Sequence, residues 1–386
     1  RFSDMRSLPT LRRRRRVGCV TVYQRSKRFW IYYRQGGQPV RMPVGSQQDE
    51  ALQIAAKVNA ELAEGARPSL QFRPITIDVL VHQWLDQHEH IRRSSLATVR
   101  RYRTAVHHLT DFLASRHGVL RADRFNAGMA EQFVRYLRGV QVAPNGHPHA
   151  ARRPLRDKGV IFILETCRAL FSFAARQRHL PAYAPNPFSG LSIERMPIED
   201  AKPIRPLTPQ QEMTFFKACD AWQFPIFFVL AFTGLRVGEL THLLIDHGVD
   251  LDAGVLRVLN KPGLGWQVKT RNVRDVPLLP EVATIMQGGM RGRHAGPVFL
   301  RRRFTKGGDL PLLAGRSVLE LEQEVVRRTA TAQAAAPSPL SRAEVARIAR
   351  SVWLDAGGIK ETTIRGEFMK VTTKIGLAHL TCPKDL

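Results

Sequence analysis

The chain has 386 residues, which is enough for two or three domains. Its 59 lysine and arginine residues outnumber 33 aspartate and glutamate residues, so the formal net charge at pH 7 is +26. Hydrophobic residues make up 44% of the chain, which excludes wholesale disorder, and the excess of cations predicts a polyanionic partner. The longest strongly apolar run, Phe224 to Phe232, is shorter than the ~18 residues that span a bilayer. We therefore expect no membrane segment.

The spacing of cysteine and histidine gives no sign of a metal site. His147 and His149 lie in a loop rich in proline and glycine, with no further ligand at metal spacing. The four cysteines are too scattered for a disulfide scaffold or a CxxC zinc site: Cys19, Cys167, Cys219 and Cys382. We expect no metal, no cofactor and a reducing, cytoplasmic location.

Composition divides the chain into three domains, with an arm and two linkers. Residues 1–16 form a basic arm that ends in LRRRRR, for which a solvated tail, a targeting signal and a phosphate-binding arm are all open interpretations. Residues 66–74 and the proline-rich residues 191–206 are predicted linkers. The predicted domains are residues 17–65, 75–190 and 207–386. The third domain opens with the helix-start signal LTPQQE, in which Thr208 is the expected N-cap.

The first domain has the pattern of a small sheet. VGCVTVYQ, RFWIYYRQ and PVRMPVG are three short stretches rich in β-branched and aromatic residues, and the Gly36-Gly37 pair suits a tight hairpin. A helix is expected from Gln48 to Ala63, where apolar residues recur on one side. Residues 17–65 therefore predict a three-stranded sheet backed by one helix.

The second domain predicts a helical bundle with one basic side. Apolar residues recur at three- and four-residue steps in residues 78–90, 96–117 and 160–178. Arginines gather on the opposite faces, where acidic residues are few. A bundle with a solvated surface is the alternative, but the charge favours a side that lies on DNA. The cations assigned to that side are Arg92, Arg93, Arg100, Arg101, Arg103, Arg153 and Arg156.

The third domain contains an arginine at a helix junction. Residues 224–245, FPIFFVLAFTGLRVGELTHLLI, predict an apolar helix, a break at Thr233-Gly234 and a second helix. Arg236 lies at the junction, beside the most buried part of the domain, and needs an anionic partner there. Glu239 lies on the same helix face and is suited to orient the guanidinium. Taken alone, a structural ion pair is the favoured interpretation.

A second group of cations follows in GWQVKTRNVRDVPLLP, residues 265–280. We expect two short strands, at 268–270 and 273–278, around a polar turn. Lys269 lies near the tip, with Arg271 and Arg274 beside it. A basic surface hairpin is the plain interpretation; the functional one is a lysine that reaches into the DNA minor groove near a reacting phosphate.

In this order and at this spacing, the two segments resemble the tyrosine recombinases, the phage-integrase family of site-specific DNA strand-exchange enzymes. TGLRVGEL is similar to the first arginine box of that family, and VKTRNVRDVPL to the β-hairpin that carries its catalytic lysine. Residues 75–190 resemble its core-binding (SAM-like) helical domain, and residues 17–65 its small arm-binding sheet. The resemblance implies a multidomain protein, mainly α with small β elements, whose residues 207–386 belong to a mixed α+β catalytic domain.

The family mechanism implies a role for each matching residue. A tyrosine of these enzymes attacks the scissile phosphate and forms a 3′-phosphotyrosine link, without metal or cofactor. Arg236 would bind a non-bridging oxygen, Glu239 would orient Arg236, and Lys269 would protonate the departing 5′-oxygen. Arg271 and Arg274 would contact DNA. The implied partners are duplex DNA with specific recombination sites and DNA-bending accessory proteins. The resemblance also implies a tetramer on synapsed DNA and a nucleoid-associated protein of prokaryotic or phage type.

The sequence departs from the family pattern near its end. The second family box reads His or Lys, two residues, Arg, then His, with the tyrosine some tens of residues later; TCPKDL places Lys384 at the first position and stops at Leu386. All six tyrosines precede Arg236. We therefore expect a truncated catalytic domain that cannot cleave DNA alone. A non-catalytic DNA-binding protein or an inactive integrase remnant is the alternative, whereas an RNA-binding protein would leave Arg236, Glu239 and Lys269 unexplained.

Residues 300–360 are longer than the family needs between the hairpin and the second box. They predict helices at 317–329 and 341–354 around a loose AAAPSP joint. We interpret them as a surface insertion, either inert or a site of protein interaction.

Overall fold

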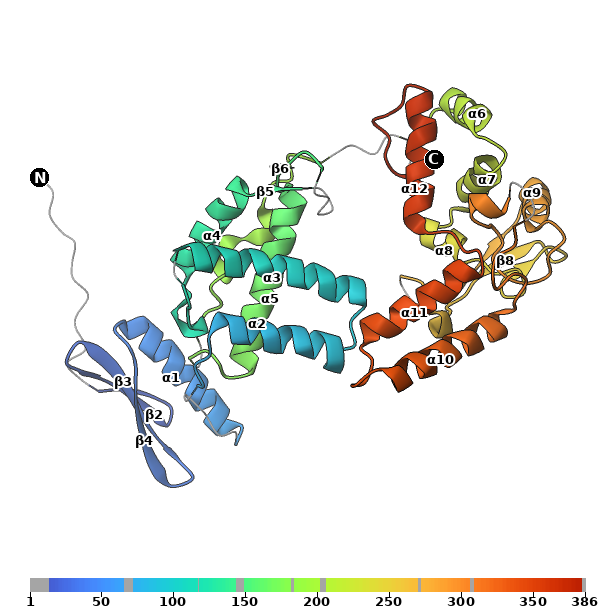
Figure 1. Cartoon of the computed structure of the whole chain (residues 1–386). Coiled ribbons are helices and arrows are strands. Elements are labelled where there is room, and N and C mark those ends of the chain that lie inside the picture. Colours follow the sequence, from blue (N-terminus) through green and yellow to red (C-terminus); the bar gives the residue numbers. More distant parts are fainter. Residues whose placement is uncertain are drawn as a thin grey trace, which may run out of the picture. The chain divides into compact units, whose positions relative to one another are not determined.

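The computed structural model describes residues 14–65, 72–116, 118–143, 149–181, 184–201, 206–269, 272–305 and 309–383. They form two compact units that divide between Ala201 and Lys202 (Figure 1). Both units are mostly helical and contain small antiparallel sheets, as the sequence predicts. Within these residues, no helix has the length and apolarity needed to cross a membrane.

The first element is a four-stranded antiparallel sheet, so the expected count of three strands is wrong. Its order is β1 (Arg15–Val17), β2 (Val20–Arg25), β3 (Arg28–Gln35) and β4 (Gln38–Gly45). The stretch expected as one strand turns at Gly18, whose φ of 59° is readily adopted only by glycine. β1 therefore pairs back onto β2 and takes Arg15 and Arg16 out of the predicted arm. Residues 1–13 of that arm and 66–71 of the first linker lie outside the described residues.

Helix α1 (Gln48–Ala63) has the predicted bounds and covers one face of this sheet. Successive side chains of a strand point to opposite faces, so every second residue of β2 and β3 reaches the helix. The small core between sheet and helix consists of Val20, Val22, Phe29, Ile31, Tyr33, Ala51, Ala55 and Val58. The other face of the sheet remains open to solvent.

The helical bundle consists of α2 (Ile77–Asp86), the π-helical turn Gln87–Ile91, α3 (Leu96–Arg116), α4 (Ala127–Gly139) and α5 (Asp157–Arg176). A short ladder of β5 (Gln141–Val142) and β6 (Arg153–Pro154) precedes α5. Helix α4 is not among the predicted helices, although Asn126 marks its start. The Asn126 side chain accepts a hydrogen bond from the Met129 N–H at 3.0 Å, which is a common N-cap contact.

The predicted linker at residues 191–206 is wrong in its first part. Ile193 is fully buried in the core of the bundle. The Asp157 carboxylate accepts a hydrogen bond from the Glu199 N–H at 2.8 Å. Prolines exclude a regular helix here but do not exclude packing, so the chain stays attached to the bundle up to Ala201.

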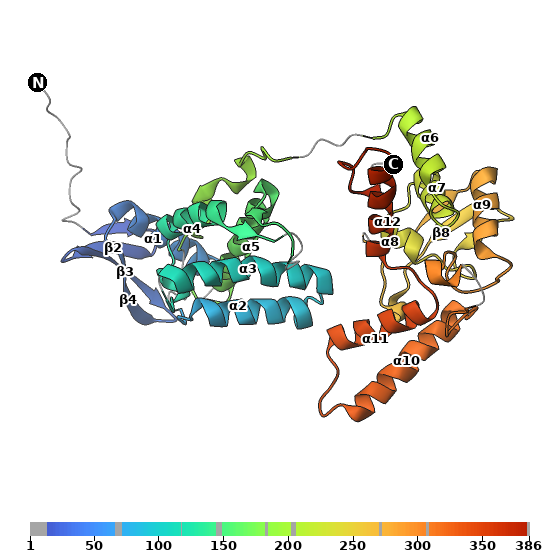
Figure 2. The same cartoon turned by 45° about the horizontal axis from the view of Figure 1, so that its top comes forward.

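In the second unit, helices pack around a three-stranded antiparallel sheet (Figure 2). The strands are β7 (Val249–Asp250), β8 (Val255–Val258) and β9 (Arg274–Pro277). The helices are α6 (Pro209–Ala218), α7 (Gln223–Thr233), α8 (Val237–Thr241), α9 (Pro280–Met290), α10 (Val318–Ala335), α11 (Arg342–Asp355) and α12 (Glu361–Lys374). Thr208 caps α6 as predicted, because its hydroxyl accepts the Gln211 N–H and the Gln211 side chain accepts the Thr208 N–H.

Helices α10 and α11 lie side by side within the predicted insertion (Figure 2). They build a core that joins Leu321 and Val352 to Leu244 and Leu264 from earlier parts of the unit. The short 3₁₀ turn Pro262–Leu264 contacts both helices. The insertion is therefore packed into the unit through buried apolar side chains.

Candidate active site

Arg236 is positioned by the turn between α7 and α8. Gly234 ends α7 with a φ of 61°, a left-handed conformation that glycine adopts without strain. Arg236 follows as the N-cap of α8, and its backbone N–H donates to Glu239 Oε2 at 2.9 Å. Its side chain is 53% exposed, so the guanidinium is open to an external anion and is less buried than the apolar sequence around it suggests.

Glu239 is the centre of a charge cluster. Its side chain is only 2% exposed. Arg236 Nη1 donates to its Oε1 at 2.8 Å, while Arg274 donates from Nη1 to Oε1 at 2.9 Å and from Nη2 to Oε2 at 2.6 Å. The contact with Arg274 is bidentate, which fixes the planes of both groups. Two cations share one anion, so the cluster is positively charged.

The charge state of the cluster is stable across the neutral pH range. Burial alone would raise the pKa of Glu239, but the hydrogen bonds from Arg274 and Arg236 outweigh burial and lower it to about 2. The hydrogen bonds with Glu239 also raise the pKa of Arg274. The carboxylate is therefore ionised at neutral pH and holds both guanidiniums.

The predicted hairpin at residues 265–280 is wrong in its pairing. β9 pairs with β8, with Arg274 opposite Val258, and Lys269 lies in the connection between the two strands. That connection is closed by backbone hydrogen bonds between Lys261 and Trp266 at 3.0 and 3.1 Å. Arg274 is the first residue of β9, so the connection that carries Lys269 ends at the side chain that pairs with Glu239.

Lys269 itself is exposed and follows a buried anchor. Val268 is 2% exposed, and its N–H donates to Asn260 Oδ1 at 2.9 Å. This contact fixes the backbone directly before Lys269. Arg271 and Lys384 lie outside the described residues, so their roles stay predictions.

The segment before residue 384 packs onto α12, which in turn contacts α8. Leu380 is 6% exposed, and the Thr372 hydroxyl donates to its carbonyl oxygen at 3.2 Å. Helix α8 packs against α12, and a Cβ on Gly238 would meet the flexible end of the Glu361 side chain, 2.8 Å from its Oε1. The approach to the predicted second box thus belongs to the same packed region as the arginine box.

The arginines predicted to bind DNA in the first unit are mostly exposed. The exposed ones are Arg92, Arg93, Arg100, Arg101, Arg103 and Arg156. Arg153 is half-buried in β6. Arg101 stacks over Phe162 at 4.2 Å from the ring centroid, and Arg103 donates to Glu89 at 3.4 Å. All of them belong to the bundle, near α3 or near the start of α5.

The open face of the N-terminal sheet combines aromatic and cationic side chains that the sequence-based prediction does not single out. Arg41 lies 5.4 Å from the ring centroid of Tyr32, and Arg25 lies 5.8 Å from that of Trp30. Tyr32 and Trp30 alternate with the buried Ile31, so strand periodicity was the signal for this face. Both rings are half-buried, and aromatic rings beside arginines are typical of surfaces that bind nucleic acid.

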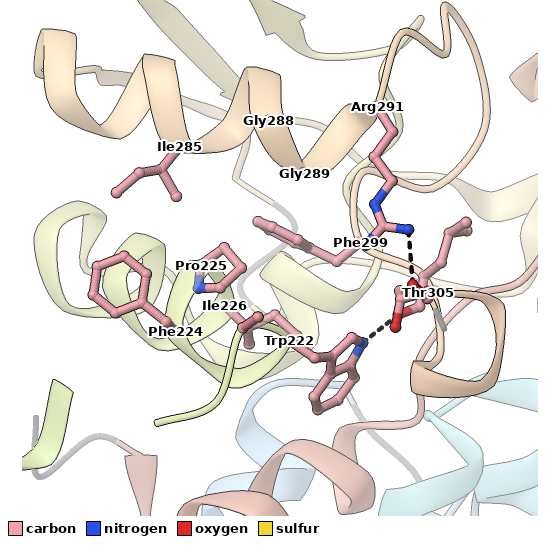
Figure 3. A pocket seen from close by; sticks show the side chains of 12 residues that line it. Trp222, Phe224, Pro225, Ile226, Ile285, Gly288, Gly289, Arg291, Phe299 and Thr305 are labelled. Atoms are coloured by element: carbon pink, nitrogen blue, oxygen red, sulfur yellow. Dashed lines mark hydrogen bonds between the residues drawn. The ribbon is translucent and has the colours of Figure 1, made fainter. Parts of the chain in front are cut away.

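A cavity between α7 and α9 has a different character. It encloses about 380 Å³, and most of the side chains that line it are apolar. Figure 3 shows Phe224, Pro225 and Ile285 on one side and Arg291 on the other, where its Nη1 donates to the Thr305 carbonyl oxygen at 3.1 Å. Its lining contains no carboxylate, cysteine or histidine. We assign no catalytic role to it.

The chemistry of the candidate site is that of fixed cations. In the part of the chain that the structure describes, no group of three or more His, Cys, Asp and Glu residues is arranged to hold a metal ion. The four cysteines are free thiols. His147 lies outside the described residues.

Comparison with known proteins gives matches among solved structures alone. No protein-family model and no curated protein matches the chain. The Tn1549 transposon integrase in complex with circular intermediate DNA is 17% identical, with 78% of this chain and 99% of that chain covered and a TM-score of 0.43. A lambda integrase dimer bound to a COC′ core site is 16% identical, with 97% and 90% covered and a TM-score of 0.42. The integrase from mycobacterium phage Brujita is 14% identical, with 80% and 75% covered and a TM-score of 0.26. At these scores the likenesses carry no argument about activity.

Proposed function

We propose that the chain is a site-specific DNA recombinase of the tyrosine recombinase type that binds duplex DNA. Where a tyrosine nucleophile is supplied, strands are cut and rejoined through a 3′-phosphotyrosine intermediate. The observation that carries the proposal is the cluster of Arg236, Glu239 and Arg274. A guanidinium that is already oriented before the reaction stabilises charge that develops on a phosphate oxygen at little reorganisation cost.

Each residue of the site has a defined task in this proposal. Arg236 binds a non-bridging oxygen of the scissile phosphate, and Glu239 keeps its guanidinium in place. Arg274 is a positioning residue that holds Glu239. Lys269 donates the proton to the departing 5′-oxygen. Lys384 takes the first position of the second family box.

The remaining surfaces supply affinity rather than chemistry. The exposed arginines of the bundle and the aromatic face of the N-terminal sheet contact phosphates and sugars, so binding weakens steeply with salt. Recombination joins two sites, so we propose a tetramer on synapsed DNA, with DNA-bending accessory proteins and a nucleoid location. A non-catalytic DNA-binding protein is the second candidate, because residues 207–386 contain no tyrosine.

Binding measured by fluorescence anisotropy at several salt concentrations tests the proposal. We expect the chain to prefer duplex DNA over duplex RNA, and Arg236→Ala to lower the slope of log K against log salt by about 0.9, the value for one phosphate contact. Arg257→Ala is the matched control, since Arg257 is exposed in the same unit and pairs with Asp250. Equal affinity for RNA, or an Arg236→Ala variant that behaves like Arg257→Ala, would contradict the proposal.

A further inference from the structure

Three stacked rings connect three separate segments of the second unit. His242 lies between Trp266 and Trp353, with ring centroids 4.9 and 5.0 Å away and ring planes within 13° and 14° of parallel. His242 Nδ1 donates to the Gly238 carbonyl oxygen at 2.8 Å, which fixes the ring on the end of α8. Trp266 belongs to the connection that carries Lys269, and Trp353 belongs to α11. The stack therefore joins the arginine box, the Lys269 connection and the insertion.

The connection that carries Lys269 is held against the insertion at further points. Leu264 is 4% exposed in the core formed by α10 and α11. A Cβ on Gly263 would lie 2.4 Å from Glu322 Oε1 on α10, and one on Gly265 would lie 3.1 Å from the Ala349 Cβ on α11. The Glu322 side chain is flexible and could move away from a larger residue at position 263, whereas the contact at Gly265 places the backbone close to α11 itself. Val268, two residues after Trp266, is buried in the main core of the unit.

Both flanking residues of the stack are themselves fixed. Trp353 is 4% exposed and packs on Gly358, where a Cβ would lie 2.2 Å from the indole Nε1. Trp266 exchanges two backbone hydrogen bonds with Lys261, whose ammonium lies 5.3 Å from the indole centroid. Lys261 is 2% exposed and donates to the Leu259 carbonyl oxygen at 3.2 Å. The rings have little freedom to separate while α11 stays in place.

We propose that the α10–α11 hairpin is a brace that positions the connection carrying Lys269, with His242 and Trp353 as its positioning residues. This rests on the proposed function, in which Lys269 transfers a proton and must stay within hydrogen-bond reach of the leaving oxygen. An error of about 1 Å in such a group costs on the order of a hundredfold in rate. The brace gives the insertion a role within the site instead of on the surface.

Hydrogen exchange of the full chain without DNA tests the brace directly. In Trp353→Leu we expect the amides of Trp266 and Val268 to exchange about tenfold faster, because an aromatic pair contributes roughly that factor beyond its buried area. Trp353→Phe should restore most of the protection. Trp222→Leu is the matched control, since it removes another buried tryptophan of the same unit outside the stack. Unchanged exchange in Trp353→Leu, or an equal change in both leucine variants, would overturn the proposal.

Two further measurements keep the test decisive. If the amides of β9 also exchange faster in Trp353→Leu, the unit has unfolded. The exchange of Gly358→Ala is then measured instead, because its new methyl group displaces the Trp353 indole. Duplex DNA affinity then links the brace to Lys269: Trp353→Leu should weaken binding in the wild-type background and have no further effect in a Lys269→Ala background. An equal loss in both backgrounds would contradict the brace. If the wild-type chain itself binds no DNA, the proposed function fails while the exchange result still decides on the brace.

Discussion

Arg274 and Glu239 are 35 residues apart in the sequence and are joined by a bidentate ion pair with N···O distances of 2.9 and 2.6 Å. The pair ties β9 to α8, and the same carboxylate orients Arg236. Arg274 was expected as a DNA contact on a hairpin, but its guanidinium is occupied by a buried carboxylate. We therefore assign it to positioning.

Replacing Glu239 by glutamine should destabilise the second unit. A neutral amide leaves two guanidiniums side by side without their anion. Because both guanidiniums are partly exposed to solvent, losing this charged acceptor costs about 2 kcal/mol in the free energy of unfolding. Urea denaturation measures this cost. Glu281→Gln, at an exposed site in the first turn of α9, is the control and should change stability by only a few tenths of that amount. Similar losses in both variants would contradict a central role for Glu239.

Replacing Arg274 by lysine should impair DNA binding nearly as much as replacing it by alanine. Lysine keeps the charge but cannot form the bidentate contact, so Glu239 and Arg236 lose their fixed orientation. The measurement is duplex DNA affinity at a fixed salt concentration. A lysine variant with wild-type affinity would show that charge alone matters at this position.

Stability should fall as the pH drops from about 6.5 towards 4, in part because of His242. Its pKa is lowered to about 4, chiefly by burial; the hydrogen bond to the Gly238 carbonyl partly offsets burial, and the nearby Lys261 ammonium adds to the lowering. In the unfolded chain the His242 imidazole has an ordinary pKa near 6.5 and binds a proton in this pH range, whereas in the folded chain it stays neutral. Acid therefore favours unfolding between these two pH values. Urea midpoints at several pH values should fall less steeply in His242→Gln than in the wild type. A His242→Gln variant whose midpoints fall as steeply as those of the wild type would contradict this account.

The two glycines of TGLRVGEL should respond differently to alanine. Gly234 has a φ of 61°, so Gly234→Ala should cost about 1 kcal/mol through backbone strain although the space around it is open. Gly238 has ordinary helical geometry, and its new methyl group would meet only the flexible end of Glu361. Gly238→Ala should therefore be tolerated. Urea denaturation of both variants checks the order, and the reverse order would contradict this account of the turn.

A nicked suicide substrate should yield no covalent adduct with this chain. The segment from residue 207 onward has no tyrosine to attack the phosphate. Denaturing gel electrophoresis detects an adduct by its slower migration. A longer protein, if the gene continues past Leu386 with an arginine, a histidine and a tyrosine, should form one. A covalent adduct with this chain would contradict the prediction that the attacking tyrosine is absent.

Local signals in the sequence predict much of the helical framework. Thr208, with proline after it, marks the start of α6, and Gly234 marks the end of α7, because caps and breaks depend on neighbouring residues alone. The turn at Gly18 does not follow from the sequence, since a single glycine within a β-rich stretch is a weak signal. Ile193 shows that proline-rich composition does not exclude burial.

The candidate site was predictable only in part, because its contacts are long-range. Arg236 and Glu239 share one short helix, so their pairing follows from spacing. The partner strand of β9 and the contact of Arg274 with Glu239 depend on how distant segments pack. The stack around His242 draws its rings from three such segments, and no local pattern encodes it.

A double-mutant cycle on duplex DNA binding tests most directly whether two cations from distant segments act on one phosphate. The variants are Arg236→Ala, Lys269→Ala and the double variant. If both side chains contact the same phosphate, their effects on the binding free energy should differ from additivity by about 1 kcal/mol. Losses that add within roughly 0.3 kcal/mol would place the two groups on separate phosphates and contradict the proposed site.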